Sequence, residues 1–103
     1  MNYRLVLRSR AQSDIRRAAH WYEGQRPGLG RAFMHQIEQG LDRVRTAPEL
    51  YQVIYRDTRR AIARRFPYGV FYRLEGQNVV VFAVLDLRRD AATWQRRGPQ
   101  GRD

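Results

Sequence analysis

The spacing of apolar residues changes character along this chain, and that change constrains its fold more than any other feature. Between Ala11 and Val44 the apolar residues recur every three or four positions, which is typical of amphipathic helices. From Val70 to Leu85 they form runs rich in β-branched and aromatic residues, which favours strands. Helical and strand segments separated in this way along one chain indicate an α+β fold.

The helical part divides into two segments. Ser9 and Gln12 have the spacing of a capping box, and Asp14 favours a helix N-terminus at this point. This first helix is expected to end near Gly24, before the turn at 27–28. A second helix is expected from about residue 29 to 46, closed by Ala-Pro at 47–48. Two helices joined by so few residues are expected to pack as an antiparallel hairpin.

The remaining segments predict strands. An opening strand is expected over 3–8, and a hairpin over 70–74 and 79–85 with its turn at 75–78. The segment 59–66 also predicts a strand, but neither of its faces is cleanly apolar, so its register stays open. The segment 51–55 is either an edge strand or an extended lead-in, and 88–97 is either a short helix or an ordered tail.

The expected order is therefore β-α-α-β-β-β, in an α+β fold. The helix hairpin is expected to cover one face of a mainly antiparallel sheet of three or four strands. The other face is expected to stay open and to carry arginines. Residues 1–97 are expected to form one domain, and 98–103 a flexible C-terminal tail.

The net charge is strongly positive. Twenty arginines and no lysines oppose ten acidic residues, giving +10. A charge this large costs self-repulsion, for which an acidic partner is the usual compensation. The absence of cysteine excludes disulfides and thiolate metal sites. No apolar run approaches the ~18 residues that a membrane span needs, and the charged start argues against a signal peptide. A cytoplasmic location without membrane contact is expected.

Ordinary catalytic patterns are not visible. His20 and His35 lie in the predicted helices, without acidic residues at ligand spacing, so no metal site is expected. Ser9 and Ser13 lack the glycine-rich elbow of a serine nucleophile. The glycines match neither a dinucleotide-binding nor a P-loop spacing, and no cofactor is expected.

Arginines and aromatic residues interleave in the second half of the chain. Basic groups beside stacking rings are typical of nucleic-acid-binding surfaces. The alternative is that the rings face the core and the arginines form a solvated face. The residues concerned are Arg56, Arg59, Arg60, Arg64, Arg65, Arg73, Arg88, Arg89, Arg96 and Arg97, with Tyr55, Phe66, Tyr68, Phe71, Tyr72 and Trp94.

Three stretches resemble one protein family. The segment from Trp21 to Phe33 resembles the helix-hairpin turn of the RelE/ParE toxin superfamily. The segment 64–72 resembles the central strands of its ParE-like members, and 83–94 resembles their C-terminal signature. The resemblance implies a toxin of a type II toxin–antitoxin pair. Its partner would be an acidic, ParD-like antitoxin with a ribbon-helix-helix N-terminus and a disordered tail that folds on the toxin.

The resemblance leaves two activities to weigh. RelE-like members cut messenger RNA in the ribosome, whereas ParE-like members are associated with poisoning DNA gyrase. RNA cleavage needs groups that move protons and stabilise phosphate charge. Here Gly69 replaces an arginine, Arg60 stands where a lysine would act, and Trp94 has no titratable proton. Asp86 stands where many relatives carry histidine, and its charge would repel phosphate. An enzymatic role is therefore left open, and a gyrase or topoisomerase inhibitor is favoured.

The alternative is a ribosome-dependent endoribonuclease, and a non-toxic nucleic-acid-binding module ranks third. The resemblance and the charge together assign candidate residues to each role. A nuclease would use Arg60, Arg64, Arg88 and Arg89. A target-binding surface would use Arg64, Arg65, Arg88, Arg89 and Trp94. The antitoxin would dock on Trp21, Tyr22, Phe33, Arg59, Arg60 and Arg73.

Overall fold

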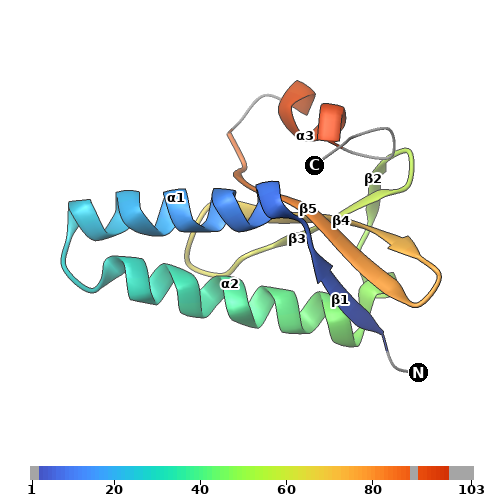
Figure 1. Ribbon diagram of the computed structural model, residues 1–103, viewed down its shortest axis with the longest axis horizontal. Coiled ribbons are helices and arrows are strands. Elements are labelled where there is room, and N and C mark those ends of the chain that lie inside the picture. The colour runs from blue at the N-terminus through green and yellow to red at the C-terminus, as the bar shows by residue number, and fades with distance from the viewer. Residues whose placement is uncertain (1–2, 89–90, 98–103) are drawn as a thin grey trace.

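The computed structural model describes residues 3–88 and 91–97. Two long helices and five strands make up most of this part of the chain (Figure 1). In chain order the elements are β1 (Arg4–Leu7), α1 (Ser9–Gln25), α2 (Leu29–Thr46), the 3-10 helix η1 (Pro48–Leu50), β2 (Val53–Tyr55), β3 (Thr58–Ile62), β4 (Tyr68–Glu75), β5 (Asn78–Asp86) and α3 (Ala91–Arg97).

The strands form one sheet in the order β1-β5-β4-β3-β2. β1 runs parallel to β5, and the other three pairs are antiparallel. The predicted α+β architecture, with a helix hairpin on a mainly antiparallel sheet, is confirmed. The sheet has five strands rather than three or four, because the short segment Val53–Tyr55 pairs with β3 as an edge strand.

The main core lies between the helix hairpin and one face of the sheet. α1 and α2 lie side by side and antiparallel (Figure 1), as the helical spacing predicted. Ile15 of α1 and Phe33 of α2 are at most 5% exposed, and both belong to the buried cluster that includes Tyr72 of β4. Fully burying a side chain of this size stabilises the fold by roughly 1.5–3 kcal/mol. The hairpin is therefore held by its apolar stripe rather than by helix propensity.

The start of α1 differs from the prediction. Ser9 is already helical, and the N-cap residue is Arg8, whose side chain makes no capping hydrogen bond. The N–H of Arg8 still donates to the Val81 carbonyl at 2.9 Å, so β1 runs directly into α1. Gln12 Nε2 donates back to the Leu7 carbonyl at 2.9 Å. The capping-box prediction and the assignment of Asp14 to the first turn are therefore wrong.

The second face of the sheet is partly covered, so the prediction of an open face is also wrong in part. The segment 88–97 was predicted as either a short helix or an ordered tail. It contains the helix α3, whose Trp94 is only 9% exposed. The indole stacks on Phe71 with ring centroids 5.0 Å apart and meets Tyr55 edge-on at 5.8 Å. A second, smaller core lies under α3 as a result. The predicted tail, 98–103, lies outside the described residues.

Candidate functional site

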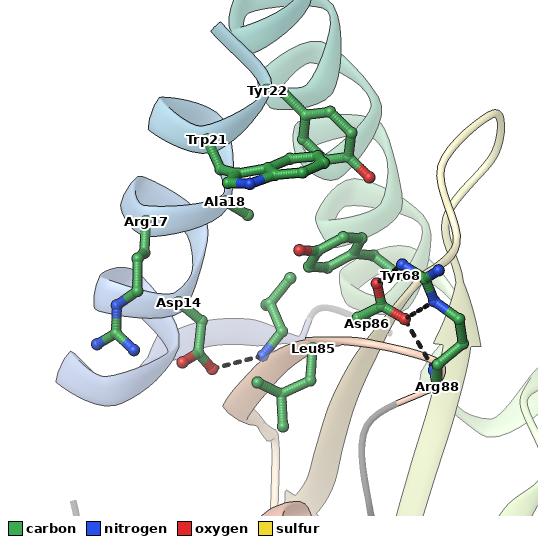
Figure 2. Close-up of a pocket in the computed structure, with 10 residues that line it drawn as sticks. Asp14, Arg17, Ala18, Trp21, Tyr22, Tyr68, Leu85, Asp86 and Arg88 are labelled. Carbon is green, nitrogen blue, oxygen red and sulfur yellow. Dashed lines mark hydrogen bonds and ion pairs between the residues drawn. The ribbon is translucent and has the colours of Figure 1, made fainter. Parts of the chain in front are cut away.

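A groove of about 480 Å³ opens beside α1, where the C-terminal half of this helix faces the end of β5 (Figure 2). Its walls combine an aromatic end, an ion pair and a small apolar floor. We call it the hairpin groove. It is lined by Asp14, Arg17, Ala18, Trp21, Tyr22, Tyr68, Val84, Leu85, Asp86 and Arg88.

The groove exists because β5 is longer than its neighbour β1. Their pairing ends at Leu7 and Val81, where the chain turns into α1, but β5 continues to Asp86. The last residues of β5 therefore lie beside a helix instead of a strand. A buried backbone N–H without a strand partner needs another acceptor. Asp14 supplies it, because its Oδ2 accepts from the N–H of Val84 at 2.9 Å.

Asp14 also binds α3. Arg97 donates to Asp14 Oδ2 from Nη1 at 2.6 Å and to Oδ1 from Nη2 at 3.2 Å. The two side chains are 4% and 13% exposed. A buried charge is tolerated only when it is paired and hydrogen-bonded, and both conditions hold here. Asp14 is therefore a structural residue that joins α1, β5 and α3.

The aromatic end of the groove projects from the helix hairpin. Trp21 is 57% exposed and meets the Tyr22 ring edge-on, with centroids 5.0 Å apart. Tyr22 in turn stacks on Phe33 at 5.2 Å and touches Tyr68 at 6.1 Å. Burial raises the pKa of Tyr22, and the nearby Asp86 carboxylate raises it further. At neutral pH this phenol stays protonated, which suits packing and hydrogen bonding better than proton transfer.

The opposite end holds an ion pair. Asp86 Oδ1 accepts from the backbone N–H and Nε of Arg88 at 2.8 and 2.9 Å, and Oδ2 accepts from Nη2 at 2.6 Å. The Arg88 side chain is 81% exposed and that of Asp86 is 18% exposed. Hydrogen bonding to Asp86 raises the pKa of Arg88. Asp86 therefore presents a charge that Arg88 already balances, which weakens the predicted repulsion of phosphate.

Arg64 and Arg65 lie in the loop between β3 and β4, and both are exposed. The loop is held by three backbone hydrogen bonds of 2.8 Å, including one from the N–H of Leu87 to the Pro67 carbonyl. Arg65 adopts a φ of 71°, a left-handed conformation that is uncommon for a residue with a side chain. Arg64 does not line the hairpin groove. It borders a second hollow on α2, together with His35.

Arg60 lies across Gly69 on the neighbouring strand. A Cβ on Gly69 would lie 3.1 Å from both Cγ and Cδ of Arg60 and 3.1 Å from Leu87 Cδ2. That is closer than ordinary van der Waals contact, so a larger residue here would displace the arginine stem. The space beside Gly69, where the resemblance leads one to expect an arginine, is thus taken by the stem of Arg60.

Several predicted site residues make internal contacts instead of lining the groove. Phe33 is fully buried, and Trp94 is buried under α3. Arg59 Nη1 donates to the Tyr51 carbonyl at 2.7 Å. Arg73 pairs with Glu75 at 2.6 Å, and its guanidinium lies 5.8 Å from the centre of the Phe82 ring. Arg89 lies outside the described residues. The structure therefore brings together Trp21, Tyr22 and Arg88 from the predicted set.

The prediction missed the other contributors from α1, which are Asp14, Arg17 and Ala18, and it did not assign Val84 and Leu85 of β5 to a site. Arg17 and Trp21 are four residues apart on α1, and that spacing places them on one helix face. This signal is present in the sequence. No comparable signal links Asp14 to Arg97, since 83 residues separate them.

Residues 3–88 and 91–97 were also compared with the requirements of a metal site and of a membrane span. Nowhere in this part of the chain do three or more histidine, aspartate or glutamate side chains cluster closely enough to hold a metal ion. None of its helices is both long and apolar enough to span a bilayer. What the groove offers is a binding surface of rings and guanidinium groups.

A helix hairpin on a mainly antiparallel sheet, with arginines at its rim, defines a ParE-like α+β fold. A solved structure described as the chromosomal ParDE TA system from P. aeruginosa superimposes with a TM-score of 0.72, covering 80% of this chain and 92% of that one. The two chains are 13% identical, so this likeness concerns the fold. No curated protein matches the sequence.

A family model adds the more specific assignment. The model for the ParE toxin of the type II toxin-antitoxin system, parDE, matches residues 5–91. The chain therefore belongs to the ParE toxin family. The match includes the hairpin groove, from Asp14 through Arg88, and both helices of the hairpin.

Proposed function

We propose that this toxin inhibits DNA gyrase or a related topoisomerase in the cytoplasm and is neutralised by a cognate acidic, ParD-like antitoxin. One observation carries the choice of target: the arginines of the candidate surface hold charge but are unsuited to moving a proton. Arginine stays protonated in proteins, so it binds phosphate or carboxylate without acting as a general base. The positions that would serve an RNA-cleaving site are Arg60, Gly69, Asp86 and Trp94.

The surroundings of these positions support binding over cleavage. Asp86 is tied to Arg88 by three hydrogen bonds, and Trp94 of α3 is buried, at 9% exposed. A general acid or base works best with a pKa near the working pH. The pKa of Tyr22, the phenol that α1 contributes to the groove, is instead raised.

The target surface in this proposal is formed by Arg64, Arg65, Arg88 and Arg89. Arg88 and the loop arginines are exposed, as a binding surface requires. Trp94 would contribute indirectly, by holding α3 against the sheet. The endoribonuclease remains the second candidate, and the hollow shared by His35 and Arg64 is the feature that favours it.

Two parallel assays test the choice. Purified toxin is added to gyrase with relaxed plasmid and, separately, to ribosomes programmed with messenger RNA. We expect supercoiling to be inhibited or cleaved DNA to be trapped, with the message left intact. Arg88→Ala should weaken the inhibition, and Arg16→Ala, on the exposed side of α1, should not. Unchanged supercoiling beside cleaved message would overturn the proposal in favour of the endoribonuclease.

A further inference from the structure

The hairpin groove unites residues that the sequence assigned to two different roles. Trp21 and Tyr22 were expected to contact the antitoxin, and Arg88 was expected to contact the cellular target. All three line the same groove of about 480 Å³ (Figure 2). A ligand that fills this groove therefore contacts both sets at once.

The middle of the groove is apolar. Ala18 and Val84 are buried beneath it, and the Trp21 indole stands over it with more than half of its surface exposed. A large exposed ring beside a concave apolar floor is typical of an interface anchor. An aliphatic or aromatic side chain of a partner would be covered on two sides here.

Arginines on two sides of the groove, Arg17 of α1 and Arg88 after β5, attract negative charge. Both aspartates of the groove are already paired, Asp14 with Arg97 and Asp86 with Arg88, each at 2.6 Å. Arg17 has no acidic partner within the described residues, and its Nη2 reaches Ser13 Oγ at 3.3 Å. Arg88 uses Nε and Nη2 on Asp86, and guanidinium has further N–H donors to offer. The net charge of +10 adds a long-range attraction for acidic partners.

We propose that the hairpin groove is the docking site of an acidic peptide segment of the antitoxin, in which an apolar side chain lies between two carboxylates. The apolar side chain packs against Trp21 and Ala18, and the carboxylates bind Arg17 and Arg88. The inference rests on the proposed function for the existence of the antitoxin. Its consequence is that neutralisation covers Arg88, so antitoxin and target compete for one residue.

The test measures binding of the purified antitoxin, encoded by the adjacent reading frame, to the full toxin chain by calorimetry. Arg17→Ala, Trp21→Ala and Arg88→Ala should each weaken binding about tenfold or more, which is the size expected for central interface residues. Matched controls are Arg16→Ala and His20→Ala, which change exposed neighbours outside the groove and should stay within about twofold of wild type. Circular dichroism confirms that each variant is folded.

A second measurement locates the contact. Toxin labelled with 5-fluorotryptophan gives two ¹⁹F signals, and Trp21→Phe identifies the exposed one. Antitoxin binding should shift the Trp21 signal and remove its sensitivity to solvent D₂O, while the signal of buried Trp94 stays in place.

The outcomes separate the two proposals. If the antitoxin binds but the groove variants match the controls and Trp21 stays exposed, the hairpin groove is not the docking site. The proposal of a toxin–antitoxin pair then still stands. If the antitoxin does not bind wild-type toxin at all, both proposals fail. If the Trp21 signal instead moves with toxin concentration alone, a second copy of the chain occupies the groove, and the assignment to the antitoxin is overturned.

Discussion

The contact between Asp14 and Arg97 is expected to contribute more stability than a carboxylate at a helix N-terminus, the role that the sequence predicted for Asp14. The pair is buried, with side chains 4% and 13% exposed and a shortest distance of 2.6 Å. Removing one partner of a buried pair costs about 3–5 kcal/mol, because the other charge is left without compensation. Asp14→Ala also leaves the N–H of Val84 without its acceptor, a loss of about 1–3 kcal/mol that overlaps with this cost.

The assay is a double-mutant cycle of Asp14→Ala, Arg97→Ala and the combined variant, measured by urea unfolding. We expect each single variant to lose about 3 kcal/mol or more of unfolding free energy. The combined variant should lose less than the sum, by about 1–3 kcal/mol, because it leaves no uncompensated charge. Asp14→Asn keeps an acceptor for Val84 and should be milder than Asp14→Ala.

Additivity of the two losses within about 0.5 kcal/mol would refute this reasoning. So would an Asp14→Ala variant that loses less than about 1 kcal/mol, since that is the range of an exposed ion pair. Either result would mean that other contacts hold α3 in place, the leading one being the stacking of Trp94 on Phe71 of β4.

Three further predictions concern the helix hairpin and the core. Gly30→Ala should destabilise the fold by about 1–3 kcal/mol, because the new Cβ would lie 2.6 Å from the backbone oxygen of Ala19. Gly24→Ala, with nothing within 4 Å, is the matched control and should be neutral or stabilising in thermal unfolding. Backbone N–H groups at the hairpin turn lower the pKa of Glu23 below its ordinary 4.5, so its stabilising contribution is complete above that pH and is lost as the pH falls through the lowered value. Acid unfolding curves of Glu23→Gln should lack this part of the pH dependence, and an unchanged curve would contradict the assignment. Tyr72→Phe should cost about 1–2 kcal/mol in urea unfolding, because a buried carbonyl 2.5 Å from the hydroxyl loses its donor, and a cost near zero would mean that water replaces it.

Much of the fold was predictable because its signals are local. Helical spacing located both long helices within a few residues, and β-branched runs located β4 and β5. The arrangement of the sheet was harder. Nothing near β1 in the sequence specifies that it pairs with β5, since the partners Arg4 and Asn78 are far apart along the chain.

The wrong predictions, on Asp14 and on the open sheet face, also arise from contacts between segments distant in the sequence. Asp14 was assigned to a helix start, because its true partners, Val84 and Arg97, lie in segments that only the folded chain brings near. α3 has seven residues, and its apolar content is too small to predict that it would cover a sheet face. The same limit applies to the groove. Trp21 and Arg88 were both predicted as functional residues, but their convergence depends on how far β5 extends past β1.

The parallel pairing of β1 with β5 has a consequence for how the molecule is made. β5 is flanked by the first and the fourth strand of the chain, so the sheet cannot close until its last strand has been synthesised. Contacts between residues so distant in sequence form late and slowly, because a long loop must first be closed. During synthesis the helix hairpin can assemble with its apolar stripe still uncovered. The hairpin groove forms only at the end of this process. An antitoxin that binds the groove therefore binds toxin that has completed its folding.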